Sequence, residues 1–154
     1  MKVSLVTGGA GFIGSHLVDI LLNNGHSVRI IDDLSGGHEA NISHHKGNDR
    51  VHFHNIDINT IEPSNPVFES VDYCFHLAGI GDIVPSIDRP IDYMATNVQG
   101  TIKVLEACRY AGVSKLIYAS SSSCYGLADT PTDENHVINP QYPYALSKHL
   151  GEQA

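Results

Sequence analysis

The chain has 154 residues, of which 42% are apolar and 17% charged, as expected for one globular domain with its own core. Nine basic against seventeen acidic side chains give a formal net charge of −8. This charge argues against nucleic acid as a partner, because phosphate neutralisation needs clustered Lys and Arg. No stretch reaches the roughly 20 apolar residues of a membrane helix, and no secretory signal follows Met1. We therefore expect no membrane partner and a cytoplasmic location with reduced cysteines.

Short apolar runs alternate with helical patterns along the chain. We expect strands over residues 2–6, 27–31, 51–56, 73–77 and 116–119, and helices over residues 13–24 and 90–111. The polar residues 33–49 should form a loop, in which one helical turn is an open alternative. In the longer helix, we expect the buried stripe to comprise Val98, Ile102, Leu105 and Cys108. Strands alternating with helices predict a doubly wound parallel sheet in an α/β fold.

A glycine-rich turn, TGGAGFIGSHL, joins the first predicted strand to the first predicted helix. Gly8 permits a tight turn, Gly11 lets a pyrophosphate approach the backbone, and Gly14 lets helix and strand pack closely. The free N–H groups at the helix start would then hold the phosphates. Because the motif has a strand before it and a helix after it, it predicts a dinucleotide-binding site.

An acidic residue, Asp32, ends the second predicted strand, eighteen residues beyond Gly14. A carboxylate there can accept hydrogen bonds from the adenosine ribose hydroxyls, and it would repel a 2′-phosphate. No Lys or Arg follows between Asp33 and Ala40 to offset that repulsion. The pattern therefore favours NAD over NADP, the alternative being that Asp32 is a solvated turn residue.

The spacing of TGGAGFIG resembles the extended branch of the short-chain dehydrogenase/reductase superfamily, the nucleotide-sugar epimerases and dehydratases. The resemblance extends over nearly the whole chain and implies a Rossmann-type, three-layer α/β/α domain that binds NAD over residues 1–154. The segments NIDI, HLAG and TNVQGT match family positions around the cofactor, although HLAG also suits an ordinary strand end and Asn97 a structural asparagine. The cofactor residues that the resemblance implies are Gly8, Gly11, Phe12, Ile13, Gly14, Asp32, Asp33, Asp57, Ile58, Leu77, Ala78, Gly79, Asn97, Tyr144 and Lys148.

A serine run, ASSSSCYG, follows the fifth predicted strand, at the sheet edge where such folds bind ligands. The family places its catalytic hydroxyl four residues before the Tyr of this Tyr-Gly pair, which selects Ser121. Ser122 and Ser123 would then face the sugar. The related 4,6-dehydratases carry Thr-Asp-Glu at these three positions, and serine hydroxyls cannot replace that acid and base. The resemblance therefore implies an epimerase more than a dehydratase.

Tyr144 and Lys148 are four residues apart and should lie on one helix face. A nearby ammonium and the positive nicotinamide would favour a phenolate, which can act as a general base. By resemblance, Lys148 also hydrogen-bonds the nicotinamide ribose. The implied catalytic residues are Ser121, Tyr144 and Lys148, and the implied substrate-binding residues are Ser121, Ser122, Ser123 and Tyr144. Tyr142 is six residues from Lys148 and should point away.

These motifs imply an NAD-dependent enzyme that epimerises a nucleotide sugar at C4 through a 4-keto intermediate. The expected substrates are a UDP-hexose, a UDP-N-acetylhexosamine or a UDP-hexuronate. Two alternatives stay open: a reductase or dehydrogenase of the same fold, and a truncated NAD-binding module without turnover. Family members are roughly twice as long, so we expect the C-terminal substrate lobe to be absent and the Tyr144 helix to be cut short. The family often forms homodimers.

Histidine is frequent, with ten residues in the chain. His38, His44 and His45 fall in one predicted loop, and His76 should pack within its strand. A metal site needs three or four converging ligands, and no His–carboxylate spacing in the sequence suggests one. We therefore expect solvated or structural histidines and no bound metal.

Overall fold

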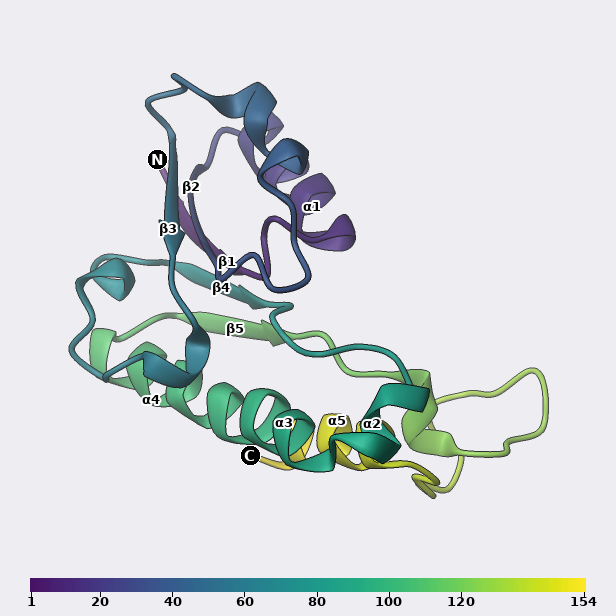
Figure 1. Cartoon of the computed structure of the whole chain (residues 1–154). Coiled ribbons are helices and arrows are strands. Elements are labelled where there is room, and N and C mark those ends of the chain that lie inside the picture. Colours follow the sequence, from purple (N-terminus) through teal and green to yellow (C-terminus); the bar gives the residue numbers. More distant parts are fainter.

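The computed structural model describes all 154 residues and contains one five-stranded parallel sheet (Figure 1). The strands are β1 (Val3–Thr7), β2 (Ser27–Asp32), β3 (Val51–Asn55), β4 (Tyr73–His76) and β5 (Lys115–Tyr118). Every bound lies within one residue of its prediction. The strands are ordered β3-β2-β1-β4-β5, and each neighbouring pair is parallel. The direction of winding therefore reverses at β1, which opens a crevice beyond the carboxyl ends of β1 and β4.

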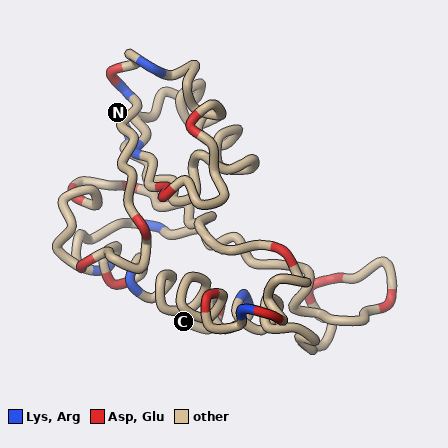
Figure 2. Tube along the Cα trace, in the orientation of Figure 1, with Lys and Arg blue, Asp and Glu red and all other residues tan.

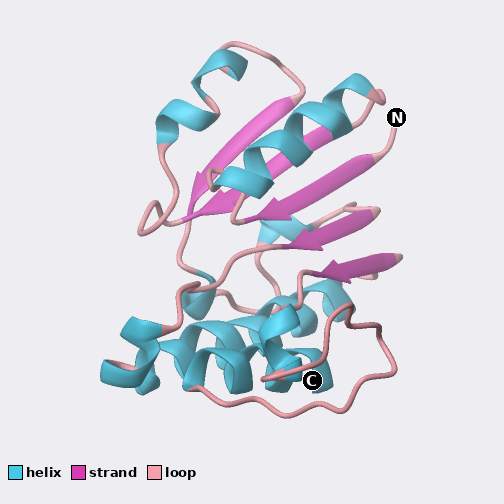
Figure 3. Ribbon diagram, turned by 90° about the vertical axis from the view of Figure 1, so that its right-hand side faces the viewer, coloured by secondary structure: helices cyan, strands magenta, loops and turns pink.

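Helices cover both faces of the sheet and make three layers (Figures 1 and 3). They are α1 (Phe12–Asn23), α2 (Val84–Asp88), α3 (Pro90–Met94), α4 (Thr101–Ala111) and α5 (Pro143–Gln153). Helix α1 packs on one face, whereas α3, α4 and α5 lie together on the other side. This arrangement confirms the predicted Rossmann-type α/β/α fold. The predicted loop over residues 33–49 contains two short 3-10 turns, Glu39–Asn41 and Ser43–His45.

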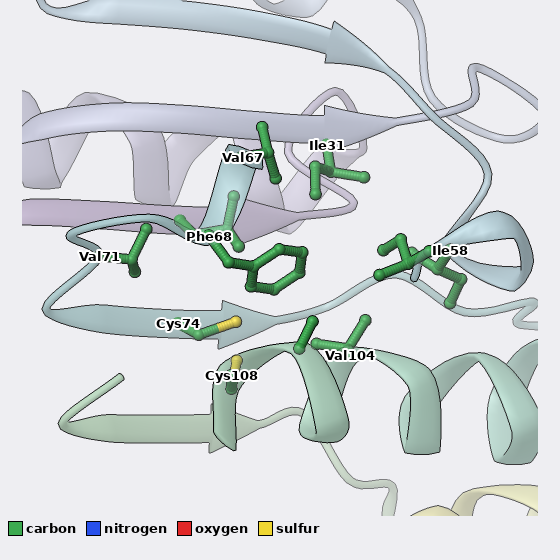
Figure 4. Packing of buried hydrophobic residues seen from close by; sticks show 11 residues of the cluster. Ile31, Ile58, Val67, Phe68, Val71, Cys74, Val104 and Cys108 are labelled. Carbon is green, nitrogen blue, oxygen red and sulfur yellow. The ribbon is translucent and has the colours of Figure 1, made fainter. Parts of the chain in front are cut away.

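Strand residues alternate between two apolar clusters, one on each face of the sheet. Val6 and Ile30 are fully buried against α1, whereas Leu5 and Ile31 belong to the cluster beneath α4. This alternation is the two-residue side-chain period of a strand buried on both faces. In the second cluster, Phe68 fills the space between the sheet and α4 (Figure 4). Other members of that cluster are Val67, Val71, Cys74, Val104 and Cys108.

The buried face of the long helix differs from the predicted stripe. Ile102 is 43% exposed, and of the four predicted residues only Cys108 is buried. The buried face instead carries Asn97, Thr101 and Val104. A π-helical segment, Ala95–Gly100, joins α3 to α4, and its wider turn shifts the phase of the face that meets the sheet. Apolar periodicity missed this face because polar residues with buried hydrogen bonds occupy two of its positions.

Charged residues are spread over many elements. Figure 2 shows Lys and Arg distributed over several elements, and Asp and Glu distributed more densely. None of the helices combines the length and the apolar character that crossing a bilayer requires. The three cysteines are free and buried, and the sulfur atoms of Cys74 and Cys108 point toward one another in the core (Figure 4).

Candidate active site

A cavity of about 570 Å³ lies at the carboxyl ends of β1, β2 and β4. Nine of the predicted cofactor residues line it: Gly8, Gly11, Asp32, Asp33, Asp57, Ile58, Leu77, Ala78 and Gly79. Sequence reasoning missed ten lining residues: Ser35, Gly36, Gly37, Ile56, Asn59, Ile80, Gly81, Asp92, Ala95 and Thr96. Among these residues, Gly36 and Gly37 form a glycine pair shortly after Asp32. This pair is the only sequence signal that could have predicted that the segment lines the cavity.

The glycine turn is held by contacts that leave no room for side chains. Gly8 has a φ of 71°, and a Cβ there would lie 2.7 Å from the backbone nitrogen of Ala78. A Cβ on Gly14 would collide with the carbonyl oxygen of Gly8. Gly11 is the N-cap of α1, and no side chain caps the helix. The turn therefore presents bare backbone to the cavity, which is the arrangement that a pyrophosphate requires.

Two predicted cofactor residues project from the start of α1 instead of lining the cavity. Phe12 is 79% exposed and Ile13 is 65% exposed. Their backbone belongs to the first turn of the helix, next to Gly11. A role for these residues toward a cofactor would therefore use main-chain N–H groups.

Asp32 connects the glycine turn to the loop that follows β2. Its Oδ2 accepts a hydrogen bond from the N–H of Ala10 at 2.9 Å, and its Oδ1 accepts from the N–H of Leu34 at 2.9 Å. Asp32 is buried, so the alternative of a solvated turn acid is wrong. Each carboxylate oxygen has a second lone pair available, and the residue borders the cavity. Gly37 packs against it, since a Cβ there would lie 2.8 Å from Oδ1.

Asp57 and Ile58 lie beyond β3 at another side of the cavity. Asp57 caps a 3-10 turn, Ile58–Thr60, by accepting from the N–H of Asn59 at 2.8 Å. Ile58 is buried and packs against Gly100 of the π-helical segment. This turn therefore links the β3 end of the cavity to the long helix.

Asn97 holds the loop after β4 in place. Its Oδ1 accepts from the N–H of Ile80 at 2.8 Å, and its Nδ2 donates to the Ile80 carbonyl at 3.0 Å and to Ser147 Oγ at 2.9 Å. Asn97 is buried behind the cavity and does not line it. It acts as a structural residue that joins the loop carrying Gly79 to helix α5.

His76 sits in a directed chain of buried hydrogen bonds. The N–H of Ala78 donates to Thr7 Oγ1, which pairs with His76 Nδ1 at 2.6 Å. His76 Nε2 pairs with Thr101 Oγ1 at 2.9 Å, and that hydroxyl donates to the carbonyl of Asn97. All donors and acceptors match when His76 is neutral with its proton on Nε2. Burial, followed by the charge of Lys148, lowers the pKa of His76 to about 3. The predicted packed histidine is therefore also a polar connector.

Ser121, Tyr144 and Lys148 converge near the end of β5. The Tyr144 hydroxyl donates to Ser121 Oγ at 3.4 Å. Ser121 Oγ in turn accepts from the N–H of Ser123 at the start of a 3-10 turn, Ser122–Tyr125. The turn places Ser123 beside Ser121, whereas Ser122 is exposed. As predicted, Tyr142 stands outside this group, at the N-cap of α5.

Lys148 is buried without a carboxylate partner. Its Nζ lies 4.3 Å from the centre of the Tyr118 ring, and a Cβ on Gly79 would lie 3.9 Å from it. Burial lowers the pKa of Lys148 to about 8. The ammonium thus lies close to the Gly79 end of the cavity, where it can act on a group bound there.

Together these parts fit a bound dinucleotide. The bare glycine turn would accept the pyrophosphate, the Asp32 carboxylate would take a ribose, and the cavity continues along the strand ends to Gly79 next to Lys148. A serine and a tyrosine in hydrogen-bond contact stand beyond that end. The fold and the site define a dinucleotide-binding domain with a Ser–Tyr–Lys group.

Comparison with known proteins specifies the family. The sequence matches the model of the NAD dependent epimerase/dehydratase family over residues 4–154, and the chain belongs to this family. It is 41% identical over 152 residues to a putative UDP-glucose 4-epimerase of Methanocaldococcus jannaschii, covering 97% of this chain and 48% of that protein. The family is NAD dependent, which confirms the prediction of NAD from the glycine turn and Asp32.

Two solved structures show the same fold at more than 25% identity. A UDP-N-acetylglucosamine 4-epimerase from Methanobrevibacter ruminantium M1, in complex with UDP-N-acetylmuramic acid, superposes with a TM-score of 0.91 at 33% identity. A UDP-glucose-4-epimerase from Stenotrophomonas maltophila, with bound NAD and formylated UDP-arabinopyranose, gives 0.92 at 30% identity. Both cover 99% of this chain, and this chain covers 48% and 47% of theirs. The chain spans about half the length of the curated relatives it matches.

Proposed function

We propose that the protein carrying this chain is an NAD-dependent epimerase acting at C4 of a UDP-sugar. The substrate would be a UDP-hexose, a UDP-N-acetylhexosamine or a UDP-hexuronate. The contact between Tyr144 and Ser121, beside the buried Lys148 at the end of the cofactor cavity, carries this proposal. The names of the related proteins, which are UDP-sugar 4-epimerases, support it.

In this mechanism, Tyr144 takes the proton of the C4 hydroxyl and Ser121 hydrogen-bonds the same oxygen. Lys148, one helical turn from Tyr144, would bind the nicotinamide ribose. NAD⁺ supplies the hydride acceptor when bound. Inversion would require the 4-keto sugar to turn over within the site, so that the hydride would return from the cofactor to the other face of C4 while Tyr144 would give the proton back to the oxygen. Ser122 and Ser123 would bind the sugar.

The absence of acidic residues next to Ser121 separates this reaction from a dehydration. Positions 121–123 are all serine, so no side chain there can serve as the acid and base that eliminate water. We further propose that residues 1–154 form the cofactor domain of a longer protein. The remaining half would supply the substrate lobe, and the protein could pair as a homodimer.

The test uses the whole protein and replaces Tyr144 by Phe. We expect C4 inversion of the UDP-sugar to fall about 10²–10⁴-fold, since a positioned acid–base group contributes about that much. Bound NAD and the melting temperature should stay unchanged. Tyr142→Phe is the matched control, because Tyr142 is 39% exposed and lies two residues away, and it should keep full activity.

Two results would overturn the proposal. Absence of C4 inversion on all three substrate classes by the wild-type protein would exclude epimerisation. A steady change in absorbance at 340 nm, with NADH or NAD released in every turnover, would instead assign the protein as a reductase or dehydrogenase.

A further inference from the structure

A cluster of possible metal ligands lies between α1 and the 3-10 turn Ser43–His45, outside the proposed catalytic group. His44 Nε2 and His45 Nε2 both contact Asp19 Oδ1, at 2.9 and 2.6 Å. One ligand atom from each of these residues lies within 4.8 Å of the other two. Asp19 precedes the histidines by 25 and 26 residues, so the fold, not local sequence, brings them together.

Both sides of this cluster are anchored in the apolar core. Asp19 follows Val18 in α1, and the two histidines belong to the 3-10 turn that follows Ile42. Val18 and Ile42 are buried in the same cluster beneath α1. The N–H of His45 also donates to the Ile42 carbonyl at 3.0 Å. The three side chains therefore start from backbone positions that are fixed relative to one another, and ligand binding would not have to order two flexible loops.

The spacing of the three atoms suits a small cation. Tetrahedral Zn²⁺ with bonds of about 2.0–2.1 Å separates its ligand atoms by roughly 3.4 Å, so side-chain rotations that open the contacts of 2.9 and 2.6 Å by about 0.5–0.8 Å would make room for the ion. Two imidazoles and a carboxylate form a borderline donor set, which selects Zn²⁺ and its neighbours over Mg²⁺ or Ca²⁺. Three protein ligands leave a fourth position for water.

Charge also favours a cation at this place. The cluster contributes one carboxylate, within a chain whose formal net charge is −8.

We propose that Asp19, His44 and His45 form a binding site for a divalent transition-metal ion, best matched by Zn²⁺. The ion would clamp helix α1 to the segment between β2 and β3. The beginning of that segment, at Asp33 and Ser35, lines the cofactor cavity. The site is separate from the proposed epimerisation, and its test does not depend on activity.

The experiment titrates the whole, tag-free protein with Co²⁺ after dialysis against a chelator. We expect visible d–d absorption that saturates at one equivalent and is displaced by Zn²⁺, together with a Zn²⁺-dependent rise in melting temperature. His44→Gln and Asp19→Asn should each weaken Co²⁺ binding at least tenfold. His38→Gln is the matched control: His38 is exposed in the same segment, and the variant should bind Co²⁺ like the wild type.

His44 is 53% exposed at its side chain, so its replacement should leave the fold intact, and the melting temperature in chelator checks this directly. Equal Co²⁺ affinity for the wild type and His44→Gln, with both folded, would overturn the proposal. So would displacement of Co²⁺ by Mg²⁺ as readily as by Zn²⁺.

Discussion

The glycine turn, at the phosphate end of the proposed cofactor site, and the tyrosine–lysine group, at its proposed catalytic end, are stabilised in different ways. Gly8, Gly14 and Asp32 belong to the contiguous β1–α1–β2 unit, and the Asp32 carboxylate satisfies backbone N–H groups there. Tyr144 meets Ser121 only through the folding of segments 23 residues apart, and no carboxylate balances the buried charge of Lys148. The phosphate end is therefore stable in itself, whereas the catalytic end carries an energetic cost that a bound ligand can offset.

The largest effect should come from filling the tight contact at the phosphate end. Gly14→Ala places a methyl group against the Gly8 carbonyl, and we expect a loss of about 3 kcal/mol in the free energy of unfolding. NAD affinity should fall more than tenfold, because the turn must shift. Urea unfolding and calorimetric NAD titration measure these quantities. Gly36→Ala is the stability control, since a Cβ there meets nothing within 4 Å; equal losses for both variants would refute the close-packing argument.

A second effect, of similar size, should appear in acid, at the connector between the two ends. The pKa of His76 is about 3 in the fold against an ordinary 6.5, so the folded state binds fewer protons than the unfolded state between these values. Its contribution to stability is complete above pH 6.5 and is lost as the pH falls toward 3. We expect the wild type to lose about 2–4 kcal/mol more than His76→Gln over this range. Denaturant unfolding at each pH measures the free energy of unfolding of both proteins. If the two values fall in parallel as the pH decreases, His76 is not a buried neutral histidine.

The smallest effect should have the opposite sign, at the catalytic end. The pKa of Lys148 is lowered from 10.5 to about 8 by burial, so the folded state resists the charged form below pH 8. Without cofactor, Lys148→Met should raise the free energy of unfolding by about 1–3 kcal/mol at pH 7 while abolishing epimerisation. The gain should shrink as the pH rises from 8 to 10.5, because the wild-type lysine becomes neutral in both states.

Lys103→Met is a matched control for the lysine, because Lys103 is 39% exposed at its side chain and should show no such pH-dependent gain. If Lys148→Met is less stable than the wild type at pH 7, favourable interactions in the folded protein outweigh the cost of burying the ammonium. The contrast between the two ends would then disappear.

The sheet and the phosphate end could be predicted from sequence because their signals are local. All five strands and the glycine turn depend on residues close together in the chain, and Asp32 follows at a fixed distance. The buried face of the long helix over residues 90–111 could not be predicted in this way. Its buried positions include Asn97 and Thr101, whose side chains make hydrogen bonds to other elements. Because these residues are polar, apolar periodicity predicted Ile102 as buried instead.

Contacts between distant segments account for the remaining differences. The chain of hydrogen bonds through His76 joins β1, β4 and α4, and the Asp19 cluster joins α1 to a turn 25 residues later. Neither has a recognisable spacing in the sequence. The contact between Ser121 and Tyr144 spans 23 residues and was found only through the family motif, since the residue types alone do not specify which serine faces the tyrosine.

The pairing of Asn97 with Ile80 has a consequence for which substitutions the site tolerates. The carboxamide of Asn97 both accepts from and donates to the main chain of residue 80, as a neighbouring strand would. The side chain of residue 80 takes no part in these bonds, so many residue types should be acceptable there. Position 97 admits only a side chain of this length with both a donor and an acceptor, and position 79 admits only glycine, because a Cβ would lie 2.9 Å from Asn97 Oδ1. Two adjacent residues of this loop should therefore differ strongly in their tolerance of substitution, with position 80 tolerant and position 79 intolerant.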